Sequence, residues 1–277
     1  MPSSRPVMDL WQAVFLGFIE GITEYLPVSS TGHLLLAGRL LGIGRGAESN
    51  AYAICIQGGA IAAVLGLYRR RVAGMIRGIV GKDETGKRLF LRILLAFLPA
   101  AVIGFLLDDW IEGKLFGLWP VAFAWAVGGV FILLVRKRGP APGASLEEIS
   151  PKQALFIGFA QCLALWPGVS RSLATILGGV SLGLSTAAAV EFSFLLGVLT
   201  LGAAASYKAL SHGGAIVKSY GLAAALLGFA SAWLFAALSV KWMVGYLEKK
   251  GLALFGYWRL AVALLAAGLL WTGLVEP

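Results

Sequence analysis

The sequence predicts an all-α, polytopic membrane protein with six transmembrane helices, two re-entrant helix–turn–helix hairpins and an inverted-topology repeat. Three observations support this fold class: the composition, the spacing of apolar runs, and a match between the two halves. Of the 277 residues, 58% are hydrophobic and 13% are charged, and the mean hydropathy is +0.83. A soluble domain needs more polar surface than this. The composition therefore excludes an ordinary soluble protein.

Apolar runs of about 20 residues are typical of helices that cross a bilayer. Long apolar segments of this kind are predicted near residues 51–68, 89–107, 118–135, 187–207, 220–245 and 252–274. Shorter apolar segments are predicted near residues 10–24, 31–43, 152–165 and 171–183. Pro27 interrupts the first short pair and Pro167-Gly168 the second. Each pair is therefore predicted to be a re-entrant hairpin, which is tolerated where protein covers it or where it lines a wet cavity.

Positive charge orients the long segments. The net charge is +9, and the basic residues gather at the ends of apolar runs, at 69–92, 136–138 and 249–250. Cytoplasmic loops carry such an excess of Lys and Arg. All three groups lie on one side if segment 51–68 runs inward and each long segment spans once. Both termini then lie outside, the first hairpin opens outward and the second inward. This pattern also argues against nucleic-acid binding.

We treat residues 1–277 as one membrane domain with two similar halves, about 1–138 and 150–277. The stretch AVFLGFIEGITEYLPVSST, from Ala13, aligns without a gap on ALFIGFAQCLALWPGVSRS, from Ala154. The match pairs Gly17 with Gly158, Glu20 with Gln161, Ser29 with Ser170 and Ser30 with Arg171. Coincidence between two Ala/Leu/Gly-rich stretches is the alternative, but polar positions match as well as apolar ones. Three spans per half invert the second half, and such repeats place sites near the midplane.

The first hairpin carries two carboxylates in an apolar segment. Glu20 and Glu24 are four residues apart, so they share one helical face. A lone charge at the bilayer centre costs about 3 kcal/mol on insertion scales, so both carboxylates need partners or water. The alternative is a pair of glutamates at a wet interface.

Hydroxyl groups and an imidazole follow these carboxylates. Ser29, Ser30 and Thr31 lie where the next helix is predicted to begin, and Ser and Thr are good N-caps. Capping explains one serine but not the whole set. A helix N-terminus also offers free backbone N–H groups to a phosphate. Gly32 would allow close backbone approach, and the spacing brings His33 within reach of the same pocket.

The second hairpin supplies Ser170, Arg171 and Ser172 at a predicted helix start, with Thr175 one turn further on. Arginine is always charged and makes forked contacts with phosphate oxygens. An arginine here needs an anionic partner. That partner is Glu20 or Glu24, a bound phosphate, or both in turn.

Together the hairpins predict a site suited to phosphate chemistry. A serine could attack phosphorus, and His33 could act as general base, general acid or nucleophile. Arg171 and backbone amides could stabilise charge on phosphoryl oxygens. Glu24 could orient the histidine or, with Glu20, hold a divalent cation. The residues alone leave these roles open.

The motifs resemble those of a known family. EGITEYLPVSSTGH resembles the EGxTExLPxSSTGH signature of the bacterial undecaprenyl-diphosphatases, the bacitracin-resistance family. QCLALWPGVSRSLATILGG resembles its second signature, PGxSRSxxT, and the similarity covers nearly the whole chain. The resemblance implies an integral enzyme of the bacterial cytoplasmic (inner) membrane that hydrolyses undecaprenyl diphosphate to undecaprenyl phosphate and inorganic phosphate. That reaction recycles the lipid carrier for peptidoglycan and other wall polymers, with the active site toward the outer face.

By motif match, the resemblance assigns site roles to the first-hairpin residues Glu20, Glu24, Ser29, Ser30, Thr31 and His33 and to the second-hairpin residues Ser170, Arg171, Ser172 and Thr175. It also implies a divalent cation, which we expect to be Mg²⁺ or Ca²⁺ and to be held by Glu20 and Glu24. The serine matching Ser30 has been favoured as nucleophile in the family, with the histidine matching His33 as another candidate. Leu173 departs from the glycine usual after SRS, and we expect its side chain to narrow that turn or to alter how closely the backbone meets phosphate.

Two rival functions remain. Inverted repeats with broken helices are also typical of transporters, and a flippase for polyprenyl phosphate would use the same midplane pocket. A transporter, however, needs no nucleophile or proton shuttle. A lipid phosphatase of the phosphatidic-acid type is rejected because no histidine follows Arg171 at the spacing of its SRxxxxxH motif. The substrate and membrane lipids are the expected partners, with a homodimer as one possible assembly.

Overall fold

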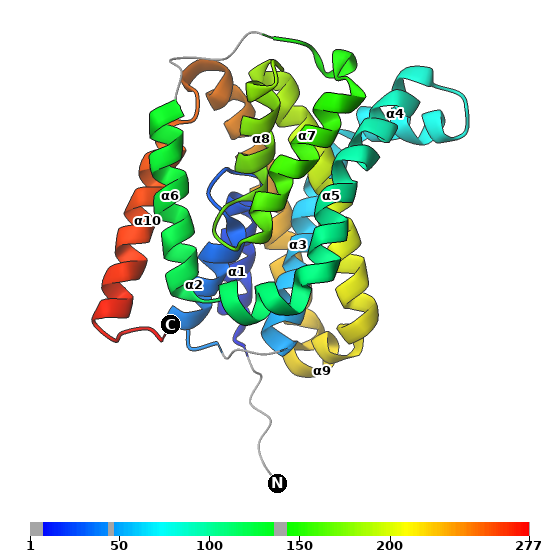
Figure 1. Ribbon diagram of the computed structural model, residues 1–277. Coiled ribbons are helices and arrows are strands. Elements are labelled where there is room, and N and C mark those ends of the chain that lie inside the picture. The colour runs from blue at the N-terminus through cyan, green and yellow to red at the C-terminus, as the bar shows by residue number, and fades with distance from the viewer. Residues whose placement is uncertain (1–7, 44–46, 136–142, 277) are drawn as a thin grey trace.

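The computed structural model describes residues 8–43, 47–135 and 143–276, which form a helical bundle (Figure 1). In chain order its α-helices and short 3-10 helices (η) are α1 (Leu10–Thr23), α2 (Ser30–Leu40), α3 (Ala47–Leu67), α4 (Arg69–Ile79), α5 (Glu84–Leu115), α6 (Leu118–Val135), η1 (Leu146–Glu148), α7 (Pro151–Cys162), η2 (Leu163–Leu165), α8 (Arg171–Ser181), α9 (Thr186–Lys250) and α10 (Ala253–Trp271).

The predicted fold class is confirmed: the protein is a helical, multi-pass membrane protein. Among the described residues, 5 helices are long and apolar enough to cross a membrane, and a bent pair would raise the number to 6. The five are Glu84–Leu115, Leu118–Val135, Thr186–Tyr207, Gly221–Lys250 and Ala253–Trp271. The pair consists of Tyr52–Leu67 and Arg69–Ile79, with a bend of 83° between them.

Three segments differ from the expected pattern. The basic stretch after residue 68 is helical rather than a loop, because it forms α4 and the first turns of α5. Helix α5 also extends beyond the predicted segment 89–107 and contains Pro99. The predicted segments 187–207 and 220–245 both belong to α9, which is interrupted at Gly221. Gly221 has a φ of 76°, a value that glycine adopts without a steric penalty. The basic group 136–138 lies outside the described residues.

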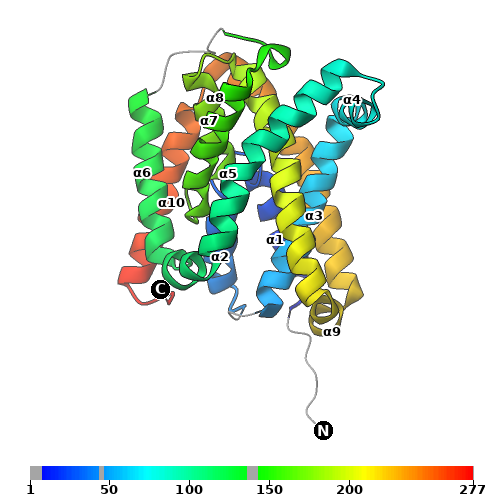
Figure 2. The same cartoon turned by 45° about the vertical axis from the view of Figure 1, so that its right-hand side comes forward.

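The two predicted hairpins are present as α1–α2 and α7–η2–α8, close to their expected bounds. They enter the bundle from opposite ends, and their tips meet near its middle (Figures 1 and 2). Helix α4 and the end of α9 near Lys250 lie toward one end of the bundle, and the C-terminal end of α10 lies at the other. The inverted repeat between the complete halves stays a prediction.

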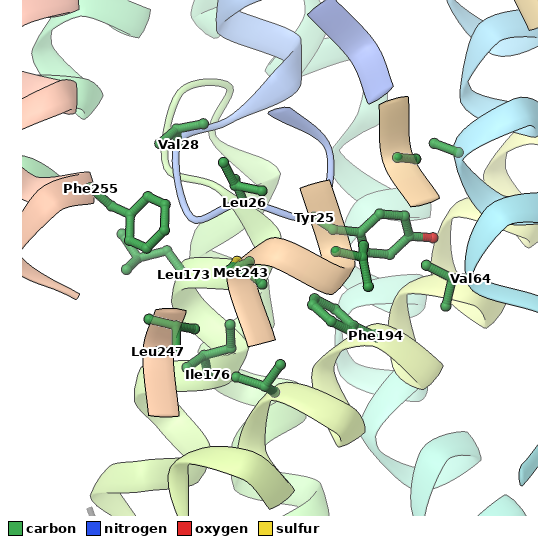
Figure 3. Packing of buried hydrophobic residues seen from close by; sticks show 14 of the residues in the cluster. Tyr25, Leu26, Val28, Val64, Leu173, Ile176, Phe194, Met243, Leu247 and Phe255 are labelled. Atoms are coloured by element: carbon green, nitrogen blue, oxygen red, sulfur yellow. The ribbon is translucent and has the colours of Figure 1, made fainter. Parts of the chain in front are cut away.

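A buried apolar cluster packs the two hairpins together (Figure 3). It joins Leu26 and Val28 at the first tip to Leu173 and Ile176 on α8. Phe255 on α10 belongs to the same cluster. Leu173 lies within the first turn of α8 and is only 4% exposed. Its side chain therefore fills the contact between the hairpins, and its effect on the turn and on the approach of phosphate stays a prediction.

A second contact between the hairpins is polar and centres on Arg259 of α10. The guanidinium is fully buried and donates hydrogen bonds to four backbone carbonyls. Nη1 donates to Pro27 (3.4 Å) and Val169 (3.1 Å). Nη2 donates to Gly168 (2.8 Å) and Ala124 (2.9 Å). One side chain thus ties both hairpin tips to α6 and α10.

Room for these contacts comes from glycines. A Cβ on Gly128 of α6 would collide with the Arg259 guanidinium. At the second tip, Gly168 has a φ of 99°, and a Cβ there would meet Val121 and Ala124 of α6. Because glycine has no Cβ and tolerates positive φ, the tip can lie against α6. The glycines thus let the arginine and the tips approach one another.

Small residues also allow α1, α3 and α9 to pack closely. A Cβ on Gly17 or Gly21 of α1 would meet the backbone of α9. A Cβ on Gly59 of α3 would meet Phe229 and Ala232 of α9. Helices in membranes associate through such small-residue contacts because lipid supplies no hydrophobic driving force between them.

We predict that Gly59→Ala destabilises the fold and Gly66→Ala does not. The added methyl group at Gly59 would overpack the contact with α9, at about 1–3 kcal/mol. Gly66 lies on the same helix with no atom within 4 Å of an added Cβ, so alanine there should be neutral or improve helix propensity by up to about 1 kcal/mol. Thermal unfolding in detergent measures both. Equal melting temperatures for the two variants would contradict close packing at Gly59.

We predict that Arg259→Lys also destabilises the protein. Lysine keeps the charge but lacks the planar fork, so at least two of the four carbonyls should lose their donor. An unsatisfied buried acceptor costs about 1–3 kcal/mol, so the free energy of unfolding should fall by at least about 2 kcal/mol. Unfolding in mixed micelles measures the loss, with the exposed Arg69→Lys as control. Wild-type stability of Arg259→Lys would show that the four contacts are dispensable.

Candidate active site

The centre of the candidate site joins the two hairpins through Glu24. The Ser30 hydroxyl at the start of α2 donates a hydrogen bond to Glu24 Oε2. Arg171 Nη2 at the start of α8 donates to Glu24 Oε1 at 3.0 Å. The side chains of Arg171 and Glu24 are only 10% and 5% exposed. A hydroxyl, a carboxylate and an arginine thus form one buried chain, the arrangement of a nucleophile, a base and a group that orients the base.

Neighbouring elements hold Arg171 in place. Its Nη1 donates to the Ser193 carbonyl of α9 at 3.1 Å. Its guanidinium carbon lies 5.2 Å from the centre of the Tyr25 ring, a cation–π distance. A Cβ on Gly197 of α9 would collide with the guanidinium. Arg171 Nε has no hydrogen-bond partner among the described residues, so one donor stays available to a ligand.

The structure places Glu20 beside this chain. Glu20 is 1% exposed, and its nearest charged neighbours are Glu24 and Arg171. Its Oε1 has no hydrogen-bond partner among the described residues, whereas both oxygens of Glu24 are occupied. The predicted closeness of the two carboxylates is therefore present. Of the two carboxylates, Glu20 has a buried oxygen without a hydrogen-bond partner in the described part of the chain.

These carboxylates fit a divalent cation only in part. In the described part of the chain, no group of three or more His, Cys, Asp or Glu side chains is arranged to hold a metal ion. Mg²⁺, however, is commonly held by one or two carboxylates together with substrate phosphate oxygens and water. Glu20, with its free oxygen, and Glu24 match that smaller set.

Both ring nitrogens of His33 have partners other than Ser30 and Glu24. Its Nε2 accepts a hydrogen bond from Trp258 Nε1 of α10 at 3.0 Å. Its Nδ1 lies 2.7 Å from the Ser29 carbonyl. Because the indole only donates and the carbonyl only accepts, these contacts require a neutral ring with the proton on Nδ1. To serve as a proton shuttle for Ser30, His33 would have to exchange these partners.

Ser29 and Ser170 occupy matching positions just before α2 and α8. Their φ values are 74° and 76°, in a region rarely populated by residues other than glycine. Such strained backbone persists where the surrounding structure enforces it, and it gathers at functional sites. Each strained serine leads directly into the free N–H groups of a helix start. The sequence alignment paired these two serines but did not predict their positive φ values.

The remaining residues of the second signature bind within the protein. The Ser170 hydroxyl accepts from the Leu173 N–H at 3.3 Å and lies 3.0 Å from the Ser172 hydroxyl. Ser172 donates to the Leu26 carbonyl at 2.9 Å, which links the two tips. Thr175 lies 2.7 Å from the Ser193 hydroxyl of α9. In this structure these hydroxyls hold the second hairpin, so Arg171 is the member of the set that reaches Glu24.

Two predicted binding residues of the first signature take other positions. Thr31 is exposed on the surface of α2. Gly32 packs against α6, where an added Cβ would collide with Trp125 and Val121. The absence of a side chain at Gly32 thus permits the α2–α6 contact, and its predicted role in the approach of phosphate stays a prediction. Trp125 in turn donates from Nε1 to the Val28 carbonyl at 2.8 Å.

An apolar groove opens next to the first hairpin. Its cavity volume is about 490 Å³. Its walls are Ile22, Thr23, Leu26, Val28, Phe235, Leu238, Ser239, Trp242, Leu254, Phe255 and Trp258. Because Leu238, Trp242 and Leu254 are themselves exposed on the bundle surface, the groove adjoins the lipid-facing side. Trp258 connects it to His33.

Sequence reasoning missed three residues that shape the site. Arg259 joins the tips, Trp258 holds His33, and Tyr25 lies against Arg171. Arg259 had a visible signal, because it is a lone charge within the apolar segment 252–274. Trp258 and Tyr25 had none, since aromatic residues are common throughout membrane helices.

Comparisons with known proteins identify the family of the chain. Residues 13–265 match the family described as bacitracin resistance protein BacA. An undecaprenyl-diphosphatase of Sorangium cellulosum is 46% identical over 263 residues, which cover 93% of this chain and 85% of the relative. Undecaprenyl-diphosphatase 1 of Chromobacterium violaceum is 42% identical over 268 residues, covering 96% and 98% of the two chains. The match takes in both hairpins and nearly all of the bundle, and the chain therefore belongs to the bacitracin resistance protein BacA family.

Proposed function

We propose that this protein is a membrane phosphatase that hydrolyses undecaprenyl diphosphate to undecaprenyl phosphate and inorganic phosphate. Family membership and the printed names of its relatives support this reaction. The observation that carries it is the buried chain Ser30–Glu24–Arg171. An ion pair between Glu24 and Arg171 would be enough for a purely structural role. Here the Ser30 hydroxyl also donates a hydrogen bond to the Glu24 carboxylate, as a nucleophile does to its base.

In the proposed reaction, Ser30 Oγ attacks the terminal phosphorus while the bond to the bridging oxygen breaks. Glu24 Oε2 takes the serine proton, and undecaprenyl phosphate leaves. Water then hydrolyses the phosphoserine, and Glu24 returns the proton to Ser30 as inorganic phosphate is released. The covalent phosphoserine replaces one difficult step by two easier ones. The carboxylate of Glu24 assists the proton transfer in each step. Attack by His33 and direct attack by water are the alternatives, and the experiment below tests the first of them.

Charge on the phosphoryl oxygens would be met by Arg171 and the start of α2. Arg171 has an unpartnered Nε–H, and arginine suits forked phosphate contacts. Ser30 and Thr31 are the first residues of α2, so their N–H groups lack helical acceptors and favour an anion. Preorganised donors of this kind supply much of the rate enhancement in phosphoryl transfer.

A divalent cation, Mg²⁺ or Ca²⁺, would neutralise part of the diphosphate charge when bound. Glu20, with its free Oε1, and Glu24 would hold it together with substrate oxygens. Without such a cation, the buried Oε1 of Glu20 would have no partner among the described residues, which is unfavourable.

The apolar groove supports a lipid substrate. It is lined almost wholly by aliphatic and aromatic side chains and adjoins both the first hairpin and Trp258. A prenyl chain matches that chemistry, and burial of each CH₂ stabilises binding by about 0.8 kcal/mol. A diphosphate on a long prenyl chain would thus place its polar end at the tips and its chain along α9 and α10.

We propose the bacterial cytoplasmic (inner) membrane as the location. The basic residues of α4 and of the end of α9 favour the cytoplasmic side, so the first hairpin would open outward and the site would be reached from the outer face. There the reaction would recycle the lipid carrier for cell-wall synthesis and lower sensitivity to bacitracin. A homodimer stays a prediction.

Phosphate release from undecaprenyl diphosphate tests the proposed function. Purified wild type should release phosphate. Ser30→Ala should lose at least about 10³-fold in kcat, because the nucleophile is gone. Glu24→Gln should lose about 10²–10⁴-fold, the usual contribution of a general base. Arg171→Lys should also lose activity because the fork is lost, whereas the exposed Ser181→Ala should match wild type.

Each other outcome has a definite meaning. Full activity of Ser30→Ala together with loss in His33→Ala would transfer the nucleophile to His33. No release by folded, metal-loaded wild type would overturn the hydrolase proposal and favour the flippase, in which the same pocket binds a lipid phosphate without cleaving it.

The cation site has its own test. Glu20→Gln should raise the Mg²⁺ concentration needed for half-maximal activity by about tenfold or more, since a carboxylate ligand is lost while its shape remains. A Mg²⁺ titration of phosphate release measures this, with Glu112→Gln at the exposed end of α5 as control. An unchanged Mg²⁺ requirement in Glu20→Gln would remove Glu20 from the cation site.

A further inference from the structure

We propose that α4 and the start of α5 form a binding site for the headgroups of anionic phospholipids at the membrane surface. The helix lies near the end of the bundle where α9 ends, and it projects sideways from the spans (Figures 1 and 2). The 83° bend between α3 and α4 turns the chain away from the direction of the span. A helix in that position would lie along the membrane surface rather than across it.

The outer surface of α4 has the composition of an interfacial helix. Ile76, Ile79 and Val80 are 59%, 58% and 62% exposed. Their spacing places them on one face. Arg70 and Arg77 are seven residues apart on an adjacent face, and both are exposed. An apolar face beside an arginine-rich face is typical of helices that lie in the headgroup region and bind anionic lipids.

Helix α4 packs closely against α5. A Cβ on Gly78 would collide with the backbone at Lys87, and a Cβ on Gly86 with the backbone at Gly74. The backbones of α4 and α5 thus touch through glycines. Asp83 caps α5 by accepting from the Gly86 N–H at 2.8 Å. The exposed apolar face therefore belongs to a packed element, and its exposure calls for a partner outside the bundle.

The charge of this region is strongly positive. Residues 69–92 include eight Arg or Lys and two acidic residues. Arg71 is neutralised by Glu191 (2.8 Å) and Glu147 (2.7 Å). The hydrogen bond from Arg71 holds the pKa of Glu147 below its usual range, so this carboxylate stays ionised.

Arg70 and Arg88 are exposed and form no ion pair with an acid in the described part of the chain. Arg88 lines a hollow between α5 and η1 together with Arg92 and Thr85. Unpaired positive charge is thus exposed both on α4, at Arg70, and at the start of α5, at Arg88.

A lipid fits this surface better than a free anion does. Leu91 on α5 is 46% exposed, so apolar side chains are exposed near the start of α5 as well as on α4. A bound molecule would thus meet arginines at one end and apolar side chains at the other. Anionic phospholipids have this division within one molecule, and basic segments next to a span attract them.

Titration of short-chain phosphatidylglycerol into the detergent-solubilised full chain tests the proposal, with phosphatidylcholine of the same chains as reference. Wild type should bind phosphatidylglycerol more tightly. The double variant Arg70→Gln/Arg88→Gln should lose affinity by about fivefold for each arginine removed. Arg70→Lys/Arg88→Lys, which keeps the charge, should stay close to wild type. Lys249→Gln/Lys250→Gln removes the same charge at the end of α9 and should change nothing.

Ile76→Ser/Ile79→Ser should weaken phosphatidylglycerol binding without altering charge, and glycerol phosphate, which lacks acyl chains, should not compete. Equal affinity for the two lipids in wild type would overturn the proposal. So would unchanged binding in Arg70→Gln/Arg88→Gln, an equal loss in Lys249→Gln/Lys250→Gln, or competition by glycerol phosphate at the concentrations where the lipid binds.

Discussion

The rest of the structure depends on a buried arginine that bridges two broken helices. Hairpin tips expose backbone carbonyls that lipid cannot satisfy, and each unsatisfied group costs several kcal/mol at membrane depth. Arg259 brings its donors to Pro27, Gly168, Val169 and Ala124. The same contacts compensate the guanidinium, whose burial without partners would be unfavourable. The free carbonyls of the tips and the buried charge of Arg259 thus satisfy each other. Their hydrogen bonds hold the two tips close together.

Two arginines at the centre of the bundle therefore have different roles. Among the described residues, the hydrogen bonds of Arg259 go only to carbonyls, which suits a structural role, whereas Arg171 also pairs with a carboxylate, that of Glu24. Each lies against a glycine, Gly128 and Gly197 respectively, whose Cβ would collide with the guanidinium. The first arginine aligns the hairpins, and this alignment lets the second reach Glu24 across the interface. The proposed chemistry thus depends on a residue that touches none of its reacting groups.

The arrangement also reconciles polar chemistry with an apolar surrounding. The carboxylates, the arginine and the strained serines lie at the tips, while an apolar groove runs beside them along α9 and α10. A substrate with a charged end and a long hydrocarbon chain has the same division. At the edge of the bundle, α4 repeats it on a smaller scale, with arginines beside exposed isoleucines. In both places the protein pairs charge with apolar surface because its solvent is a bilayer.

The sequence by itself determined the helical membrane class, both hairpins, and the residues that the first tip presents, since these follow from local periodicity, breakers and short spacings. It also singled out Glu24 and Arg171, because charged residues in apolar segments need partners, and Ser30, because its hydroxyl lies at a predicted helix start. Only the tertiary structure decided which of them meet. His33 is hydrogen-bonded to Trp258 and not to Ser30. The hydroxyls of Ser172 and Thr175 form hydrogen bonds within the protein. Arg259 joins the tips. These pairings link residues far apart in the chain, and packing geometry, which local patterns do not encode, selects each partner.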